Sequence, residues 1–211
     1  MEQALRTMLT MQDRMNTRVH PDWVNQDFAW YRALWTECAE LIEHYGYKWW
    51  KKQTPDIEQV RLEVIDIWHF GLSALFAGGD SINTMAANIA AELRDFQPAG
   101  LGVREATEAL ALHSLQTRGF SPTRFWELML ASGLDFERLY SAYVGKNVLN
   151  FFRQDHGYQD GSYQKLWQGR EDNEHLVEVL AVLDSTAFDY AECVYAALQA
   201  RYPGTPVPAR A

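Results

Sequence analysis

The sequence of 211 residues predicts an all-α protein, a helical bundle. Long segments repeat apolar residues every three to four positions, as helices with one buried face do. Most glycines and prolines fall between these segments, and no segment shows the sustained alternation of apolar and polar residues that is typical of a half-buried strand. With 47% hydrophobic residues and eight tryptophans, the chain can form a packed core.

The first three helices are predicted from their apolar stripes. The first covers about 2 to 18 and the second about 27 to 46, where apolar residues recur along one face. The third covers about 57 to 77, and two consecutive glycines end it because glycine loses more backbone entropy in a helix than any other residue. Apolar residues surround most of this third helix, so we expect it to be buried on all sides.

Short polar side chains mark the starts of later helices, because an oxygen there accepts a backbone N–H that the helix leaves unpaired. Asp80 or Ser81 is expected to cap the fourth helix, Ser121 the sixth, with Pro122 in its first turn, and Asp172 the eighth. The ranges of the later helices are about 80 to 96, 103 to 118, 122 to 132, 135 to 153, 172 to 184, and a ninth helix to about 201.

A polar, glycine-bearing loop of about 18 residues joins the seventh and eighth helices. Its aromatic side chains favour a functional loop over a disordered one. No repeat, low-complexity block or linker divides the chain, so we expect a single domain over 1–202. Within it, 78–133 is a candidate for a smaller, mobile cap, and 203–211 is expected to be a flexible tail.

Charge and composition favour an enzyme that acts on small molecules. The net charge of −9 argues against a nucleic-acid partner and against binding to an anionic membrane, since both need a basic surface. The amino terminus lacks the basic start and apolar core of a secretory signal, and the longest apolar run is too short to span a bilayer. Cys38 and Cys193 lack metal spacing, which indicates reduced thiols and a cytoplasmic protein.

Two acids interrupt the apolar surface of the third helix. In "LEVIDIWHF", Glu63 and Asp66 are three residues apart and are therefore neighbours on one face, with His69 continuing the line. Burying two adjacent carboxylates is costly unless a cation lies among them, so this stripe predicts a positive partner. Arginine or lysine side chains are the alternative to a metal, and His69 is expected to be a core histidine hydrogen-bonded to a backbone carbonyl.

The second helix carries a similar pair of acids, Glu37 and Glu40, in "ECAELIE". Two antiparallel helices that face each other would bring the two acid pairs together. An all-oxygen cluster suits a hard cation such as Mg²⁺. A solvated acidic face is the alternative for Glu37 and Glu40.

The seventh helix carries a polar line formed by Tyr143, Lys146, Asn150 and Arg153, which are spaced three, four and three residues apart. Cations and amide groups that converge from one side are what a phosphate binder needs. A charged outer face would explain the lysine and arginine equally well, but not the asparagines. Together with the carboxylates, this line indicates a site for a metal-bound polyphosphate.

These motifs resemble those of the dimeric all-α dUTPases, which belong with MazG-like enzymes to the helical NTP pyrophosphohydrolases. The segments "ECAELIE", "KWWK" and "RLEVIDIWHF" are similar to the metal motifs ExxE and ExxD of that family. The resemblance implies that Glu37, Glu40, Glu63 and Asp66 hold Mg²⁺, with two or more ions per site. It also implies an active site between the antiparallel helices that carry these acids.

A second block, "YVGKNVLNFFRQDHGYQDGSY" followed by "GREDN", resembles the nucleotide-binding block of the family. The resemblance implies phosphate or sugar contacts from Lys146, Asn150, Arg153, Tyr158, Lys165 and Asn173. The segment "MQDRMN" is similar to the part of the family that reads the uracil edge. It implies base contacts from Gln12 and Asn16, with Trp50 and Phe70 as walls of the base pocket. The blocks cover roughly 8 to 76 and 135 to 180 and leave 78–133 unmatched.

The family implies that a homodimer hydrolyses dUTP, and also dUDP, to dUMP with Mg²⁺. Glu40 is expected to accept or orient the proton of the attacking water, with the other three acids as catalytic partners. Two alternatives stay open. One is a related enzyme that cleaves dCTP or a broader set of triphosphates. The other is a helical nucleotide-binding or protein-interaction module that has lost turnover, although all four acids are present in this sequence.

Overall fold

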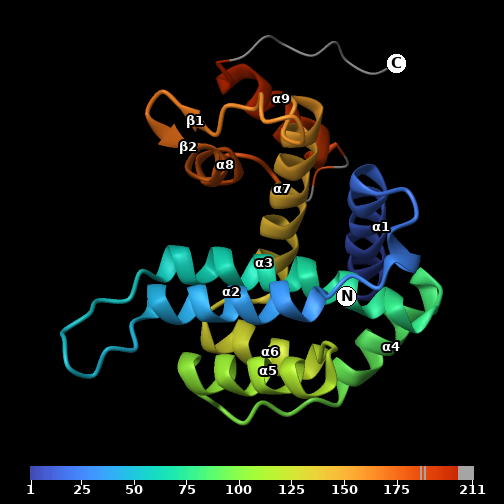
Figure 1. The fold of residues 1–211 in the computed structure, drawn as a ribbon, viewed down its shortest axis with the longest axis vertical. Coiled ribbons are helices and arrows are strands. Elements are labelled where there is room, and N and C mark those ends of the chain that lie inside the picture. Colours follow the sequence, from blue (N-terminus) through green and yellow to red (C-terminus); the bar gives the residue numbers. More distant parts are fainter. Residues whose placement is uncertain (186, 188, 204–211) are drawn as a thin grey trace. The chain divides into compact units, whose positions relative to one another are not determined.

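The structure is a computed structural model that describes residues 1–185, 187 and 189–203. It confirms the all-α prediction, since helices form nearly all of the regular structure in these residues (Figure 1). In chain order the elements are α1 (Glu2–Val19), η1 (Trp23–Gln26), α2 (Trp30–Tyr45), α3 (Ile57–Leu75), η2 (Phe76–Gly78), α4 (Ile82–Arg94), α5 (Val103–Thr117), α6 (Pro122–Ala131), α7 (Phe136–Asp155), β1 (Leu166–Trp167), β2 (Arg170–Glu171), α8 (Asp172–Leu180) and α9 (Tyr190–Arg201).

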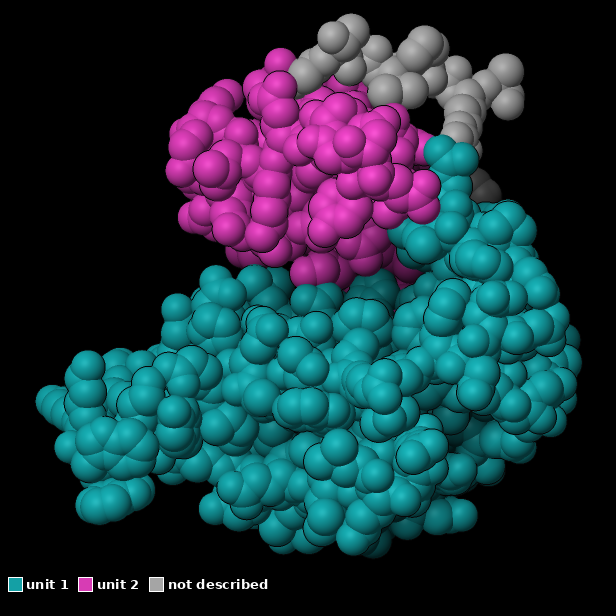
Figure 2. All heavy atoms as spheres, viewed as in Figure 1, with its two compact units in different colours: residues 1–140 teal, residues 141–211 magenta. Residues whose placement is uncertain are grey.

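The chain divides into two compact units, residues 1–140 and 141–211 (Figure 2). Unit 1 contains α1 to α6 and the start of α7, and unit 2 contains the rest of α7 with β1, β2, α8 and α9. The single domain over 1–202 stays a prediction. Segment 78–133 forms α4, α5 and α6, which pack on α1, α2 and α3 within unit 1, and its role as a mobile cap also stays a prediction. Apart from Pro203, the predicted tail lies outside the described residues.

The helix starts follow local chemistry where the sequence shows a cap. Ser81 accepts a hydrogen bond from the backbone N–H of Thr84 at 3.2 Å, and Ser121 accepts one from Arg124 at 3.4 Å, so both predicted caps are confirmed. Helix α2 begins three residues later than expected. Asp27 has a left-handed backbone with φ of 50°, which separates the short helix η1 from α2.

The predicted cap of α8 is wrong by one residue. Glu171 is the N-cap, and its backbone N–H donates to the carboxylate of Glu174 at 2.8 Å in a reciprocal capping box. Asp172 is the first residue of the helix instead. Its fully buried carboxylate has a different role, in the core of unit 2.

Two short strands interrupt the polar loop that was expected to lack regular structure. Trp167 pairs with Arg170 in an antiparallel hairpin, and the connecting residues Gln168 and Gly169 both have positive φ, 54° and 81°. Such a two-residue turn matches the natural twist of a hairpin. The hairpin positions Trp167, which is fully buried and stacks on His175 with ring centroids 5.2 Å apart.

Aromatic packing around α3 forms the core of unit 1. The Trp68 ring stacks on Phe125 of α6 with centroids 4.5 Å apart, and its indole N–H donates to the sulfur of Met8 in α1 at 3.3 Å. Gly71 allows Phe120 to approach α3 closely, because a Cβ atom at this glycine would lie 2.5 Å from the phenyl ring. Helix α3 is therefore held on several sides, which fixes the direction of its polar side chains.

Both cysteines are free thiols, Cys38 buried and Cys193 partly exposed. Burial raises the pKa of the Cys38 thiol to about 12, so this thiol stays protonated at neutral pH. Among the helices that the structure describes, none combines the length and hydropathy needed to cross a bilayer.

Candidate active site

Helices α2 and α3 form an antiparallel pair that carries the predicted acids. They are joined by the loop after Gly46 and pack against each other along their length (Figure 1). Gly46 ends α2 with φ of 89°, a conformation that other residues rarely adopt, and Asp56 caps α3 by accepting from the N–H of Gln59 at 3.2 Å. The turn and the cap together set where the two helices face each other.

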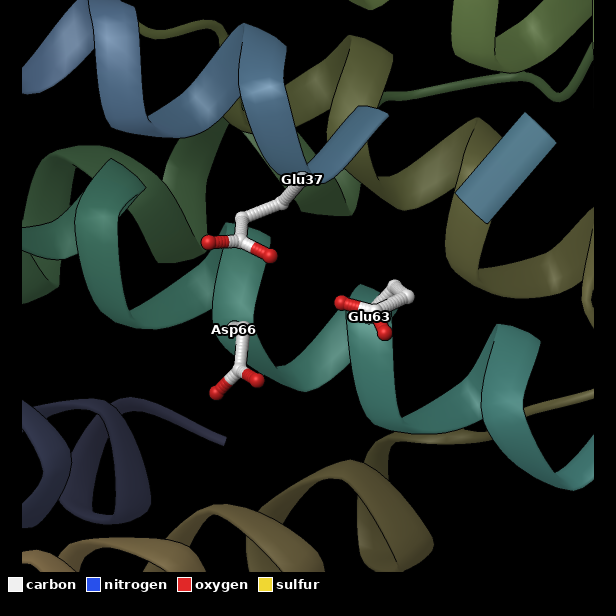
Figure 3. A group of neighbouring side chains, drawn as sticks. All are labelled: Glu37, Glu63 and Asp66. Carbon is white, nitrogen blue, oxygen red and sulfur yellow. The ribbon is translucent and has the colours of Figure 1, made fainter. Parts of the chain in front are cut away.

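Three of the four predicted metal ligands come together at this interface. Glu37 of α2 points toward α3, where Glu63 and Asp66 lie one turn apart (Figure 3). Each of the three offers a carboxylate oxygen, and these oxygens lie within 4.8 Å of one another. Glu63 is buried and the other two are half-buried. Glu40 is exposed on α2, one turn beyond Glu37.

The three carboxylates strongly disfavour full ionisation without a cation. Burial raises the pKa of Glu37 to about 8, assisted by a hydrogen bond with Glu63 and by the charges of Asp66, Glu63 and Glu40. In the absence of metal, Glu37 therefore holds a proton at neutral pH. A divalent cation would replace this proton and relieve the repulsion.

The donor set fits a hard divalent cation. All three groups are carboxylates, Mg²⁺ is bound in proteins by oxygen ligands, and it usually keeps several waters or substrate phosphates in its shell. Glu37, Glu63 and Asp66 are thus the described residues that could hold such an ion. Their rigid helical supports favour a fixed geometry.

His44 is a member of this region that the sequence analysis missed. Its Nε2 atom lies 3.5 Å from Oε1 of Glu63, and its side chain is 36% exposed. It lies seven residues after Glu37 on α2, two turns along the same face, and this spacing was the available signal. A protonated His44 would neutralise part of the charge on Glu63.

The two predicted base-reading amides are buried and bonded to polar side chains of α3. Gln12 Nε2 donates to Asn16 Oδ1 at 3.1 Å, and Asn16 Nδ2 donates to Ser73 Oγ at 2.9 Å. His69 Nδ1 lies 2.9 Å from Gln12 Oε1. The predicted partner of His69 is a backbone carbonyl, whereas the structure places the side-chain amide of Gln12 beside its Nδ1.

The two predicted walls of the base pocket have different surroundings. Phe70 is half-buried on α3 and stacks on Trp30 of α2, with centroids 6.3 Å apart. Trp50 lies in the loop between α2 and α3 and is 60% exposed, packing edge-on against Trp49 and Tyr47. Phe70 is thus fixed by its packing, while Trp50 presents most of its surface to solvent.

In unit 2, Arg153 forms a buried ion pair that the sequence analysis missed. Its Nε and Nη2 atoms donate to the two oxygens of Asp172 at 2.8 and 2.9 Å, and Tyr163 also donates to Asp172 at 2.8 Å. Burial opposes ionisation of Asp172, but the hydrogen bond and charge of Arg153 outweigh it and hold the pKa of the carboxyl below its usual range. The third guanidinium nitrogen, Nη1, donates to Asn150 at 3.3 Å.

The remaining predicted phosphate and sugar contacts also lie in unit 2. Lys146 is buried, and its Nζ donates to Asn173 Oδ1 at 3.4 Å. Tyr158 is half-exposed, and the guanidinium of Arg153 lies over its ring at 5.9 Å from the centroid. Lys165 is exposed and pairs with Glu171 at 3.1 Å. Five of the six predicted side chains thus contact another member of the set. The sixth, Lys165, has its described contact with Glu171 instead.

The fold and the carboxylate group define a class of protein, an all-α protein with a candidate metal centre between two antiparallel helices. The family model described as dUTPase matches residues 4–158, more than half of the chain. The chain therefore belongs to the all-α dUTPase family, and it is a dUTP diphosphatase, a hydrolase. A comparison with curated proteins finds no match. The family match includes all four acids and ends before Lys165 and Asn173.

The raised pKa of Glu37 predicts that metal-free protein loses stability as the pH rises toward 8. Folded Glu37 titrates at about 8 and the ordinary value is 4.5, so between these values the folded state holds a proton that the unfolded chain has released. The free energy of unfolding falls with rising pH wherever the folded state binds more protons than the unfolded chain. In EDTA, the melting temperature of the wild type should therefore fall as the pH rises from 4.5 to about 8, relative to Glu37→Gln, whose neutral amide has no such proton.

Glu58→Gln is the matched control for this titration, because Glu58 is an exposed acid of α3 that pairs only at the surface with Arg61. Its melting curve should follow the wild type across the pH range. Parallel curves for the wild type and Glu37→Gln would contradict the assignment. Addition of Mg²⁺ near pH 7 should also release protons, which calorimetry in buffers of different ionisation enthalpy measures.

Proposed function

We propose that this dUTP diphosphatase is Mg²⁺-dependent and converts dUTP to dUMP and pyrophosphate, and dUDP to dUMP and phosphate. Such an activity would limit uracil incorporation into DNA and supply dUMP. The observation that carries the proposal is the group formed by Glu37, Glu63 and Asp66 in a member of the dUTPase family, because three close carboxylates call for a divalent cation.

The acids of α2 and α3 have separate proposed roles. Glu37, Glu63 and Asp66, with Glu40 beside them, would hold two or more Mg²⁺ ions. Bound Mg²⁺ would lower the pKa of a coordinated water and neutralise charge on the phosphate oxygens. Glu40 would accept or orient the proton of the attacking water. Its exposure on α2 supports this role, because a carboxylate in contact with solvent can pass that proton on.

The cationic and amide side chains of unit 2 are proposed to hold the phosphates and the sugar. They are Lys146, Asn150, Arg153, Tyr158, Lys165 and Asn173. The ion pair with Asp172 supports the proposal for Arg153, since it holds the guanidinium in one orientation and so lowers the entropy lost on binding phosphate.

Gln12 and Asn16 are proposed to read the uracil edge, with Trp50 and Phe70 as walls of the base pocket. An amide offers both a donor and an acceptor, which the O4 and N3–H groups of uracil require. Exclusion of UTP would follow if packing near the sugar leaves no room for a 2′-hydroxyl. Exclusion of dTTP would follow if the pocket stops short of the thymine methyl.

The enzyme is further proposed to be a cytoplasmic homodimer that binds neither nucleic acid nor membranes. The net charge of −9 supports the last two points, because polyanions and anionic lipids repel an acidic surface. Analytical ultracentrifugation of the purified protein would determine the oligomeric state.

A substrate panel tests the proposed activity. Purified protein with Mg²⁺ should release pyrophosphate from dUTP with a kcat/KM far above that for UTP, dCTP or dTTP, and EDTA should abolish the reaction. For dCTP the physical reason is that a site built to hydrogen-bond the uracil edge rejects a base that leaves its polar groups unpaired, by factors that reach about 10⁴. UTP and dTTP present the same edge and would be rejected by packing against the 2′-hydroxyl and the methyl. Equal rates on all four substrates would contradict the specificity, and no turnover of any would favour the silent binding module.

A further inference from the structure

Four buried residues of α1 and α3 are joined in a ring by three hydrogen bonds between side chains and one from Ser73 to the backbone carbonyl of His69. The ring runs from Ser73 to the backbone carbonyl of His69 at 3.0 Å and from the ring nitrogen of His69 to Gln12 at 2.9 Å. It continues from Gln12 to Asn16 at 3.1 Å and from Asn16 back to Ser73 at 2.9 Å. All four residues are buried.

The ring has two self-consistent directions, and the Ser73 hydroxyl distinguishes them. A backbone carbonyl only accepts, so when Ser73 donates its one hydrogen to the His69 carbonyl, its oxygen must accept from the Asn16 amide nitrogen. The oxygen of Asn16 then faces Gln12 and must accept from the Gln12 amide nitrogen. The Gln12 oxygen consequently faces His69, whose Nδ1 must carry a hydrogen.

Reversal of one amide alone would place two acceptors or two donors against each other. All members must therefore reverse together, with Ser73 donating to Asn16 and His69 accepting from Gln12. That reversed ring loses the bond from Ser73 to the His69 carbonyl, so it has one hydrogen bond fewer. The forward direction is favoured because Ser73 is anchored to the backbone of α3.

The direction of the ring determines what the two amides can offer to a base. Each amide has two N–H groups and two acceptor lone pairs, and the ring uses one of each kind in Gln12 and in Asn16. Uracil presents a donor at N3 beside the acceptor O4, whereas cytosine presents an acceptor at N3 beside a donor amine. Reversal of the ring would exchange the donor and acceptor edges of both amides.

We infer that His69 and Ser73 are positioning residues that lock Gln12 and Asn16 in one orientation and thereby set the preference for uracil over cytosine. This inference rests on the proposed function, in which the two amides read the base. His69 contributes the Nδ1 hydrogen, and Ser73 contributes the anchor that gives the ring its direction. Neither residue needs to touch the substrate.

The protonation of His69 tests the ring independently of any nucleotide. In protein labelled with ¹⁵N-histidine, the NMR signals of His69, assigned by their loss in His69→Asn, should show a hydrogen on Nδ1. An Nδ1 atom without a hydrogen would overturn the forward direction and with it the inference.

Substrate discrimination tests the role in specificity. The ratio of kcat/KM for dUTP to that for dCTP should fall at least about tenfold in Ser73→Ala, because the amides can then reverse. Ser132→Ala is the matched control, since Ser132 is also buried and bonds a carbonyl four residues earlier, Leu128 of α6, at 2.9 Å. It should leave the ratio unchanged. A merely structural role of Ser73 would lower both rates together, and an unchanged ratio in Ser73→Ala would overturn the inference.

Two His69 variants test the same role in specificity if Ser73→Ala fails to fold. Asparagine places an amide nitrogen near the position of Nδ1, so His69→Asn should retain the ratio, whereas His69→Leu should lose it. Equal ratios in the two variants would overturn the inference. A wild-type enzyme without preference for dUTP over dCTP would contradict the proposed function and the role in specificity together, while the NMR result would still decide the direction of the ring.

Discussion

Asp66→Asn is expected to leave the helical fold intact and to lower Mg²⁺-dependent turnover of dUTP by at least about 100-fold, since loss of groups that merely support metal ligands already costs 10- to 100-fold. Asparagine has nearly the same shape as aspartate but carries no charge, so it is a weak ligand for a hard cation. Asp66 lies beside Glu37 and Glu63, and loss of its charge removes one of the three carboxylates proposed to hold the ion (Figure 3).

Steady-state kinetics over a range of Mg²⁺ concentrations would measure this effect, with circular dichroism as the check on folding. Glu58→Gln serves as the control, because the side chain of this acid of the same helix is 74% exposed, and among the described residues it pairs with Arg61 alone. Its turnover should remain close to that of the wild type. Near-normal activity of Asp66→Asn would remove Asp66 from the metal site.

Asp172→Asn is expected to lower the free energy of unfolding by about 3 to 5 kcal/mol, the usual cost of breaking a buried ion pair by removing one partner. Asp172 is fully buried and accepts hydrogen bonds from Arg153 and Tyr163. Without its charge, the guanidinium of Arg153, whose side chain is only 13% exposed, loses its counter-ion. Urea unfolding at pH 7, followed by circular dichroism, measures the difference.

The pH dependence of this effect has a defined sign. The pKa of Asp172 is lowered in the fold from its ordinary value of 3.8, so the unfolded chain binds the proton first as the pH falls. The stability that Asp172 contributes is therefore present above pH 3.8 and is lost below it, as pH falls through the folded pKa. The difference in the free energy of unfolding between the wild type and Asp172→Asn should therefore become smaller as the pH falls below the ordinary pKa of the carboxyl.

Glu178→Gln is the control for the buried pair. Glu178 also accepts from two arginines, Arg170 and Arg201, both at 2.8 Å, but it is half-exposed. Exposed ion pairs contribute little to stability because solvent screens them, so this variant should unfold almost as the wild type does. A loss of less than about 1 kcal/mol in Asp172→Asn would show that Arg153 is adequately solvated without its partner.

The sequence predicted the helices well because their signals are local. Apolar periodicity placed each helix, and Ser81 and Ser121 marked two starts, since a cap acts within one turn. The start of α8 was missed by one residue because adjacent acids at 171 and 172 can both cap, and the choice depends on what else binds Asp172. The hairpin was missed because two-residue strands are too short to show alternation.

The candidate site was only partly predictable. Spacing placed Glu63 and Asp66 on one face of a helix, and burial among apolar residues implied a cation. Spacing places His44 on the face of Glu37, but it could not show that His44 lies beside Glu63, nor that Asp172 pairs with Arg153, because both contacts join different elements. The bonds of Gln12 and Asn16 to α3 were hidden for the same reason.

By itself the sequence determined the helical class, the acids on two helices and the family that their motifs resemble. Only the tertiary structure decided that Glu37 faces Glu63 and Asp66 while Glu40, three residues along the same helix, remains exposed. The physical reason is that helix periodicity fixes which residues share a face, but the rotation of each helix about its axis is set by packing with distant segments. In α2 this rotation places the Glu37 carboxylate among the acids of α3 and leaves the Glu40 carboxylate in solvent.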